Sequence, residues 1–372
     1  MIVKDEAAVI TRAFDSVREI VDSYIICDTG STDGTQEVIK SYWKENNLKG
    51  ELHEHEWINF GRNRTQCFEL AKGKSDYIMT LDADEVIAPF KAGEAVLDHK
   101  VVELPVLTAD MISCTTVLGT NRYQRAQFFR NGIDWKWSEP VHEVCGSEEQ
   151  TEKSYLADLC CFASTGDGDR SKEGAIKFKR DAALFEAHLV DNPENPRSWF
   201  YLAQTYGDAG EYERAIAAAD TALKYLWWDQ EIFITHLRKA RWKMALGKTI
   251  QEVTYDYLKA YSVDPRRLEP LHDLILHYSR EQEYHLSEIF VALGRMLKYP
   301  AKESLFIERE VYTWRFKDLV SVAAYWVDSH QECVNLCKEL LEEGYLPENQ
   351  KLRVEANLKG AYKKLEKKNQ EI

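Results

Sequence analysis

The chain has 372 residues, too many for one ordinary hydrophobic core, so we expect two domains. Hydrophobic residues make up 44% and charged residues 30%, values that are typical of a soluble globular protein and exclude wholesale disorder. The net charge of −14 disfavours a broad nucleic-acid-binding surface, although it leaves room for a local basic pocket.

Strand and helix patterns alternate over the first 85 residues. The predicted elements are strands at 1–3, 24–28, 52–57 and 77–81, with helices that begin near Val9, Asp33 and Phe60. For the second helix, Asp33 is the expected N-cap. Strands and helices in strict rotation predict a mostly parallel, Rossmann-like sheet with helices on both faces and a ligand site beyond the carboxyl ends of its strands.

Acidic residues follow two of these predicted strands. Asp28 ends the second strand and opens the run "DTGSTDGT", and Asp82-Ala83-Asp84-Glu85 follows the fourth. Either run alone is typical of a polar turn. Because both runs are predicted at the same rim of the sheet, they indicate one crevice. An Asp-x-Asp pair suits Mg²⁺ or Mn²⁺, which take one or two carboxylates and fill their other positions with water and phosphate oxygens.

Two arginines start the third predicted helix, in "FGRNRTQ". Arg62 and Arg64 could neutralise a bound diphosphate. The alternative is a solvated basic turn, which is disfavoured because cations at a helix N-terminus need a partner.

Residues 101–108 and 115–130 are predicted to be rich in strand, and "WKWSEPVHE" at 135–143 follows them. Trp135 and Trp137 suit either stacking on a sugar or packing in a core. A lone histidine such as His142 is more often a packing residue than a ligand.

Helical patterns replace this rotation from Ser171 onward. A tetratricopeptide signature is carried by Trp199, Leu202, Ala203, Tyr206, Gly210, Ala215 and Ala222. Later copies are degenerate, as expected towards the end of a stack. We interpret "GDGDRS" at 166–171 as a linker and expect domains at 1–168 and 169–372. The helical half is expected to bind a partner, to brace the first domain or to form a homodimer.

Five motifs, in this order, resemble the family-2 glycosyltransferases, specifically the branch in which tetratricopeptide repeats follow the catalytic domain. The motifs are "MIVKDEAAVITRAFDSV", "IICDTGSTDGTQEVI", "NFGRNRTQCFELAKG", "YIMTLDADE" and "FFRNGIDWKWSEPVHE". This resemblance covers Met1 to about Cys145. The family usually has Asn where this chain has Asp5, and several residues before "MIVK", so the first strand is short or the native start lies upstream.

The resemblance implies a GT-A fold and transfer of a sugar, with inversion, from a nucleotide diphosphate such as a UDP-sugar to a glycan or protein acceptor, with Mn²⁺ or Mg²⁺ as cofactor. The implied donor-site residues are Val3, Glu6 and Asp28 for the nucleoside, Arg62 for the ribose and diphosphate, Asp82 for the ribose or sugar, and Asp84 for the metal.

The resemblance also places "VHE" at the floor of the active site. There His142 would complete the metal shell. An inverting transfer needs a base that removes the acceptor's proton, and Glu143 is the first candidate, with Glu139 second.

Two other classes of protein compete with the glycosyltransferase. One is a non-catalytic interaction protein with a vestigial nucleotide-sugar domain, against which the intact Asp82, Asp84, Arg62 and His142 count. The other is a nucleotidyltransferase, which would normally show a Gly-rich basic loop that "VKDEAAV" lacks. Eight cysteines without zinc-ligand spacing, no bilayer-length apolar run and an acidic start predict a reduced, cytoplasmic protein.

Overall fold

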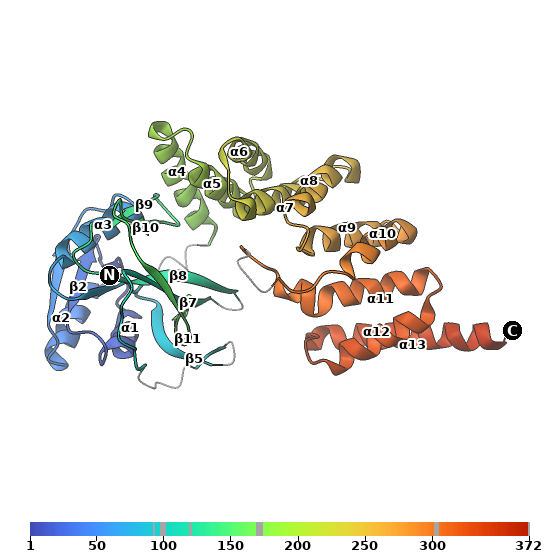
Figure 1. Ribbon diagram of the computed structural model, residues 1–372, viewed down its shortest axis with the longest axis horizontal. Coiled ribbons are helices and arrows are strands. Elements are labelled where there is room, and N and C mark those ends of the chain that lie inside the picture. Colours follow the sequence, from blue (N-terminus) through green and yellow to red (C-terminus); the bar gives the residue numbers. More distant parts are fainter. Residues whose placement is uncertain (92–93, 97–101, 119–120, 169–173, 301–304, 371–372) are drawn as a thin grey trace. The chain divides into compact units, whose positions relative to one another are not determined.

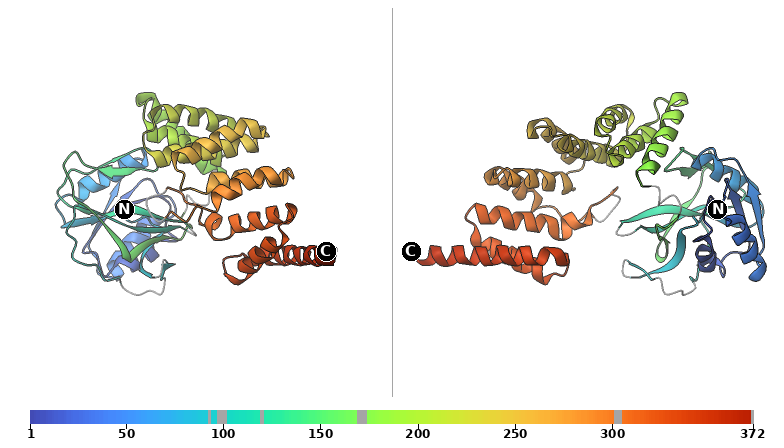
Figure 2. Two further views of the ribbon diagram at one scale, coloured as in Figure 1. Left: turned by 45° about the vertical axis from the view of Figure 1, so that its right-hand side comes forward. Right: turned by 180° about the vertical axis from the view of Figure 1, so that it is seen from behind.

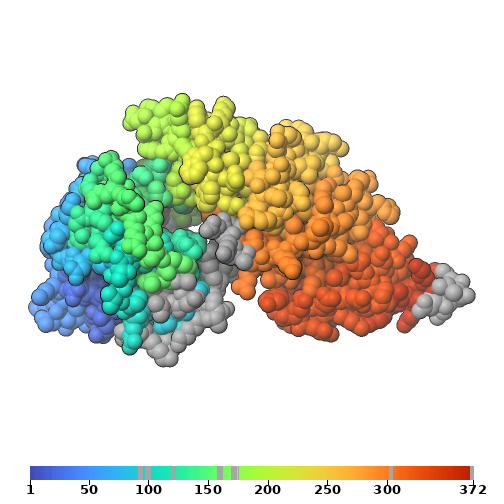
Figure 3. Space-filling view, in the orientation of Figure 1, coloured from blue at the N-terminus to red at the C-terminus, as the bar shows by residue number. Residues whose placement is uncertain are grey.

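The computed structural model describes residues 1–91, 94–96, 102–118, 121–168, 174–300 and 305–370. These residues form two compact units, Met1–Pro193 and Glu194–Ile372. They are drawn in colour as ribbons in Figure 1 and as a space-filling surface in Figure 3. No helix of the described residues is both long enough and apolar enough to cross a membrane. The domain limits expected at 168 and 169 stay a prediction.

The first unit begins with a parallel three-stranded sheet in the order β1-β2-β3. Its elements are β1 (Ile2–Val3), α1 (Ile10–Val17), β2 (Tyr24–Asp28), α2 (Thr35–Glu45), β3 (Gly50–Glu54) and α3 (Phe60–Ala71). Val3 is in register with Asp28, and Asp28 with Glu54. The carboxyl ends of these strands therefore meet at one edge, as the rotation of elements predicts.

A second sheet of six strands is mainly antiparallel, in the order β4-β8-β7-β11-β5-β6. Its strands are β4 (Tyr77–Met79), β5 (Glu85–Lys91), β6 (Glu94–Ala95), β7 (Met111–Leu118), β8 (Asn121–Arg130) and β11 (Lys153–Ser164). The fourth predicted strand pairs here, antiparallel to β8. Antiparallel strands need no helical crossover, and no helix is described between β4 and β11.

The prediction of strands at 101–108 is wrong for the residues described there. Residues 102–108 form no strand, and the next strand begins at Met111. Pro105 lacks the backbone N–H that a sheet ladder requires, which accounts for the interruption. Residues 101, 119 and 120 of the predicted strand regions lie outside the described residues.

An antiparallel ribbon of β9 (Lys136–Ser138) and β10 (Val144–Gly146) carries the "WKWSEPVHE" segment. Trp135 is buried, and its Nε1 donates a hydrogen bond to Arg130 O at 2.9 Å. Trp137 packs edge-on against Phe68. Packing therefore accounts for both tryptophans. The unit ends with α4 (Ala175–Asp191).

The second unit is helical. Its helices are α5 (Pro196–Asp208), α6 (Tyr212–Tyr225), α7 (Asp229–Ala245), α8 (Ile250–Val263), α9 (Glu269–Arg280), α10 (Tyr284–Gly294), a π-helical turn (Val311–Arg315), α11 (Phe316–Trp326), α12 (His330–Glu342) and α13 (Glu348–Gln370). Figure 2 shows successive helices stacked side by side. The predicted repeat positions Leu202, Ala203, Tyr206, Ala215 and Ala222 are buried, because they form the faces that α5 and α6 bury.

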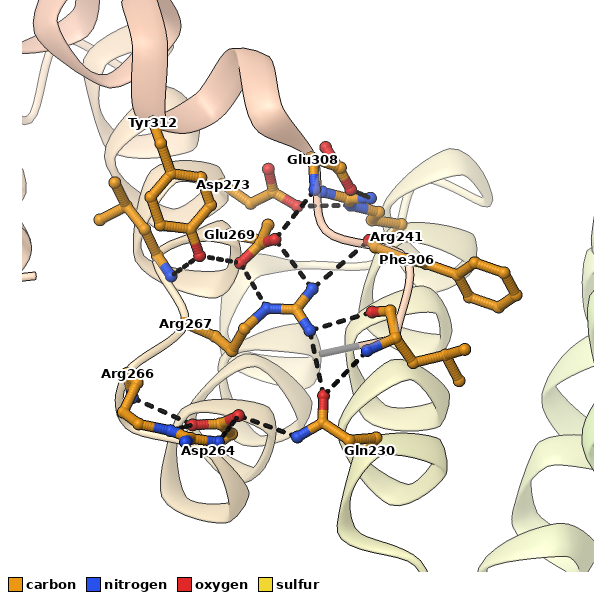
Figure 4. Close-up of polar contacts among 12 residues, drawn as sticks. Gln230, Arg241, Asp264, Arg266, Arg267, Glu269, Asp273, Phe306, Glu308 and Tyr312 are labelled. Carbon is orange, nitrogen blue, oxygen red and sulfur yellow. Dashed lines mark hydrogen bonds and ion pairs between the residues drawn. The ribbon is translucent and has the colours of Figure 1, made fainter. Parts of the chain in front are cut away.

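A buried ion pair lies at the start of α9 (Figure 4). Arg267 donates hydrogen bonds from Nε and Nη2 to Glu269 at 3.0 and 2.8 Å, and both side chains have no exposed surface. Arg267 Nη1 also donates to Gln230 Oε1 and to Leu305 O, and Tyr312 OH donates to Glu269 Oε2. These contacts hold the chain before the π-helical turn against α7 and α9.

Candidate active site

Asp28 is fully buried at the end of β2. Its Oδ1 accepts hydrogen bonds from the backbone N–H groups of Gly30 and Ser31, both at 2.8 Å. Its Oδ2 is buried and has no hydrogen-bond partner among the described residues. A buried, unsatisfied acceptor is costly, so this oxygen is suited to receive a donor group from a ligand.

The loop after β1 is tied to the loop after β2. Thr29 N donates to Val3 O at 2.9 Å, and Asp5 Oδ1 accepts from Thr32 N at 2.6 Å. The carboxylate of Asp5 thus joins the two loops. Glu6 N donates to Thr35 Oγ1 at 2.8 Å. Hydrogen bonds therefore join the two segments that contain the predicted nucleoside residues Val3, Glu6 and Asp28.

Helix α2 starts later than the sequence predicts. Its N-cap is Gly34, with φ of 91°, and Asp33 Oδ1 accepts instead from Thr35 N at 2.9 Å. The other oxygen of Asp33 accepts from Ala7 N. The carboxylate that was expected only to cap the helix also joins the two loops, and this explains the polar run after Asp28.

Arg64 lies between two carboxylates. Its Nη2 donates to Asp82 Oδ1 at 2.7 Å and its Nε donates to Glu143 Oε1 at 2.6 Å. Arg125, from β8, lies 3.4 Å from the second oxygen of Asp82 and donates to both oxygens of Glu85. Burial opposes ionisation of Asp82, but the charges of Arg64 and Arg125 outweigh it and lower its pKa to about 2.

Arg62 points elsewhere. Its side chain is exposed, and its backbone N donates to the N-cap Asn59. The structure brings Arg64 to the carboxylates because Arg64 shares the buried face of α3 with Gly61 and Phe68, three residues before it and four after. That spacing is a signal in the sequence that favours Arg64. The predicted role of Arg62 at the ribose and diphosphate stays a prediction.

Asp84 differs from its neighbours because no cation pairs with it among the described residues. Its Oδ2 accepts a hydrogen bond from Ser164 Oγ at 3.2 Å. Burial, followed by the charge of Asp82, raises the pKa of Asp84. Within the described part of the chain, no three His, Cys, Asp or Glu side chains converge as a ligand set. An ion that takes one or two carboxylates and phosphate oxygens needs no such set, so Asp84 fits it.

The hairpin between β9 and β10 holds the remaining predicted residues. Glu139 and His142 have positive φ angles of 69° and 54°, a conformation that is uncommon for residues other than glycine. Glu139 is nearly buried, with Oε2 at 4.0 Å from His188 Nδ1, whereas His142 is exposed. A Cβ atom on Gly61 would lie 2.5 Å from Glu139 O, so the hairpin lies directly on the start of α3.

The structure thus joins several predicted residues. Glu143 and Asp82 share Arg64, Val3 pairs with Asp28, and Glu6 approaches Asp84 across Gly168. Arg64, a candidate beside Arg62 in the sequence, contacts both Asp82 and Glu143, and Arg125 is a site residue that no motif in the sequence indicated. Coordination by His142 stays a prediction.

Comparisons with known proteins agree with the two-part architecture. Residues 1–136 match the model of glycosyl transferase family 2, so the first unit contains a domain of that family, and the resemblance seen in the sequence is confirmed. A TPR repeat-containing protein of Synechococcus elongatus is 31% identical over 236 residues, which are 60% of this chain and 54% of that protein. The chain therefore spans about half the length of this curated relative.

Solved structures with some likeness include MamA (TM-score 0.37, 16% identity, 50% of this chain and 90% of that one) and S. aureus TarS 1–349 (TM-score 0.32, 14% identity, 80% and 91%). At these TM-scores, neither likeness defines a function.

Proposed function

We propose that the chain is a metal-dependent, inverting glycosyltransferase that moves a sugar from a nucleotide-diphosphate donor, a UDP-sugar by family resemblance, to a glycan or protein acceptor. The observation that carries this proposal is the family-2 domain with Asp28 at the end of β2 and Asp84 in the turn between β4 and β5. Asp28 keeps a buried oxygen without a partner, and Asp84 lacks a cation among the described residues.

Each residue has a distinct part in this proposal. Asp28 Oδ2 accepts a donor group of the nucleoside, and Asp84, with His142, holds Mn²⁺ or Mg²⁺. When bound, such an ion neutralises charge on the departing diphosphate. Arg64 and Arg125 fix Asp82, and Arg64 also fixes Glu143 beside it.

Two glutamates compete for the role of base. Glu143 must share or leave its 2.6 Å contact with Arg64 before it takes a proton from the acceptor. Glu139 lies on the same hairpin, with its Oε2 at 4.0 Å from His188 Nδ1. If Glu143 is the base, Glu143→Gln keeps donor binding and lowers turnover by about 10² to 10⁴. Normal turnover in Glu143→Gln together with an inactive Glu139→Gln assigns the role to Glu139.

The test of the proposed function is hydrolysis of a panel of nucleotide sugars by the full chain with Mn²⁺. We expect turnover of one donor, lost on chelation and in Asp84→Ala, and retained in the control Asp134→Ala, whose side chain is largely exposed. Full activity of Asp84→Ala in excess chelator would rule out the metal role. Inactivity of the wild type with every donor favours the interaction-protein alternative.

We assign acceptor selection or assembly, including a homodimer, to the helical unit, because every proposed donor residue precedes Cys145. We also place the protein in the cytoplasm. A shortened chain ending at Pro193 keeps the first unit whole. If it folds, it should bind and slowly hydrolyse the donor but transfer poorly. If the shortened chain transfers sugar to the acceptor as fast as the full chain does, the repeats do not select the acceptor.

A further inference from the structure

The segment Ser164–Gly168, which starts at the end of β11, lies against Asp84. Ser164 Oγ donates to Asp84 Oδ2 at 3.2 Å, and Thr165 N donates to Asp84 O at 2.9 Å. Thr165 Oγ1 lies 2.8 Å from the same carbonyl oxygen. Residues 166–171 are expected from the sequence to be a linker, but the described residues 166–168 belong to a segment bonded to Asp84, the predicted metal residue.

Arg12, on α1, fastens this segment. Its Nη1 and Nη2 donate to Asp167 Oδ2 and Oδ1 at 2.9 and 2.6 Å, and Nη2 also donates to Thr165 Oγ1 at 2.6 Å. The hydrogen bond from Arg12 is the largest cause of a lowered pKa of Asp167. A bidentate pair of this kind fixes geometry as well as adding energy.

Gly168 brings the segment close to a second predicted donor-site residue. A Cβ atom on Gly168 would lie 3.3 Å from Asp84 Cγ and 3.3 Å from Glu6 Oε1. The backbone at Gly168 therefore occupies the space between these two carboxylates. A larger residue at this position would push on one or both of them.

The Arg12–Asp167 pair contributes little to stability by itself. The two side chains are 40% and 48% exposed, and ion pairs with such exposure typically contribute about 0–1 kcal/mol. Arg12 of the pair also donates a hydrogen bond to Thr165, and Thr165 in turn contacts the backbone carbonyl of Asp84. Residues that contact a metal ligand without touching the metal support that ligand, and their removal typically lowers metal affinity by about 10- to 100-fold.

We infer that Arg12 and Asp167 are positioning residues of the donor site, which hold the segment Ser164–Gly168 against Asp84 and thereby set its carboxylate for the cation and the diphosphate. This inference rests on the proposed function. Loss of the pair leaves the chemistry in place but loosens Asp84, so binding of cation and donor weakens more than kcat falls.

The test measures the affinity of the full chain for Mn²⁺ in the presence of UDP, from the electron paramagnetic resonance signal of free Mn²⁺. Arg12→Gln and Asp167→Asn should each raise the Kd for Mn²⁺ by about tenfold or more. The matched control is Asp110→Asn, whose partner Arg130 is also 40% exposed at an ion-pair distance of 2.7 Å. The Kd of the control variant for Mn²⁺ should stay within about twofold of the wild-type Kd.

Gly168→Ala is a second variant, which places a methyl group against Asp84 and leaves Arg12 unchanged. It should also raise the Kd for Mn²⁺. Thermal melts of all variants separate weaker binding from unfolding. Wild-type affinity in Asp167→Asn, or an equal loss in Asp110→Asn, overturns the inference. If the wild type binds neither Mn²⁺ nor UDP, the proposed function itself fails, which is a distinct result.

Discussion

Replacing Glu269 by Gln isolates the charge of the buried pair in the helical unit. Glu269 accepts two hydrogen bonds from Arg267 and one from Tyr312, and the pair has no exposed surface. Glu269→Gln keeps the size of the side chain but leaves the guanidinium of Arg267 buried without its counter-charge. Removing one partner of a buried pair costs about 3–5 kcal/mol.

The expected loss of unfolding free energy corresponds to a decrease in the melting temperature, Tm. The second unit spans Glu194–Ile372, and for a domain of such size each 1 kcal/mol lowers Tm by about 2–4 °C. We therefore expect Glu269→Gln to lower the Tm of the helical transition by roughly 6–20 °C, as measured by circular dichroism at 222 nm.

Two further variants make this experiment decisive. Glu348→Gln removes an ion pair to Lys351 in which Glu348 is 87% exposed, and it should cost at most about 1 kcal/mol. The double variant Arg267→Met with Glu269→Leu removes both charges and should recover much of the lost stability. If Glu269→Gln melts no earlier than Glu348→Gln, the pair is not buried as described and the reasoning is refuted.

Two other predictions concern one residue each. Gly61→Ala places a methyl group 2.5 Å from Glu139 O, so it should destabilise the first unit by about 1–3 kcal/mol in urea and lower turnover; unchanged values of both contradict the packing of the hairpin on α3. Burial raises the pKa of Asp256, but His236 and two lysines outweigh it and the net pKa is lowered. Its contribution to stability is therefore present above its unfolded value, near 3.9, and is lost as the pH falls through the folded pKa. The difference in unfolding free energy between wild type and Asp256→Asn should shrink as the pH falls below about 4, and growth of the difference over that range contradicts this assignment.

Local sequence patterns predicted much of the fold. The alternation of apolar runs predicts β1 to α3 in order, because each element buries one face against its immediate neighbours. The same logic places Asp28 at the end of β2, whereas β4 ends at Met79 and not, as predicted, at Leu81 beside Asp82. The spacing of Leu202 and Tyr206 identifies the repeats.

Contacts between distant residues could not be predicted in this way. Arg12 and Asp167 are 155 residues apart, and Arg125 reaches Glu85 across 40 residues. No periodicity in a single sequence records such pairings, which depend on how elements far apart in the chain pack together. The sequence names both Arg62 and Arg64 as candidate cations, and the spacing of Arg64 with Gly61 and Phe68 on α3 is the local signal that distinguishes it.

Calorimetric titration of UDP into the full chain, with and without Mn²⁺, tests the central claim most directly. The account predicts binding that needs the cation, that is lost in Asp28→Ala and in Asp84→Ala, and that persists in Glu143→Gln. Binding of no nucleoside diphosphate under any of these conditions, or binding that is unaffected by the loss of both Asp28 and Asp84, contradicts the assignment of a nucleotide-sugar site at the end of β2 and the turn between β4 and β5.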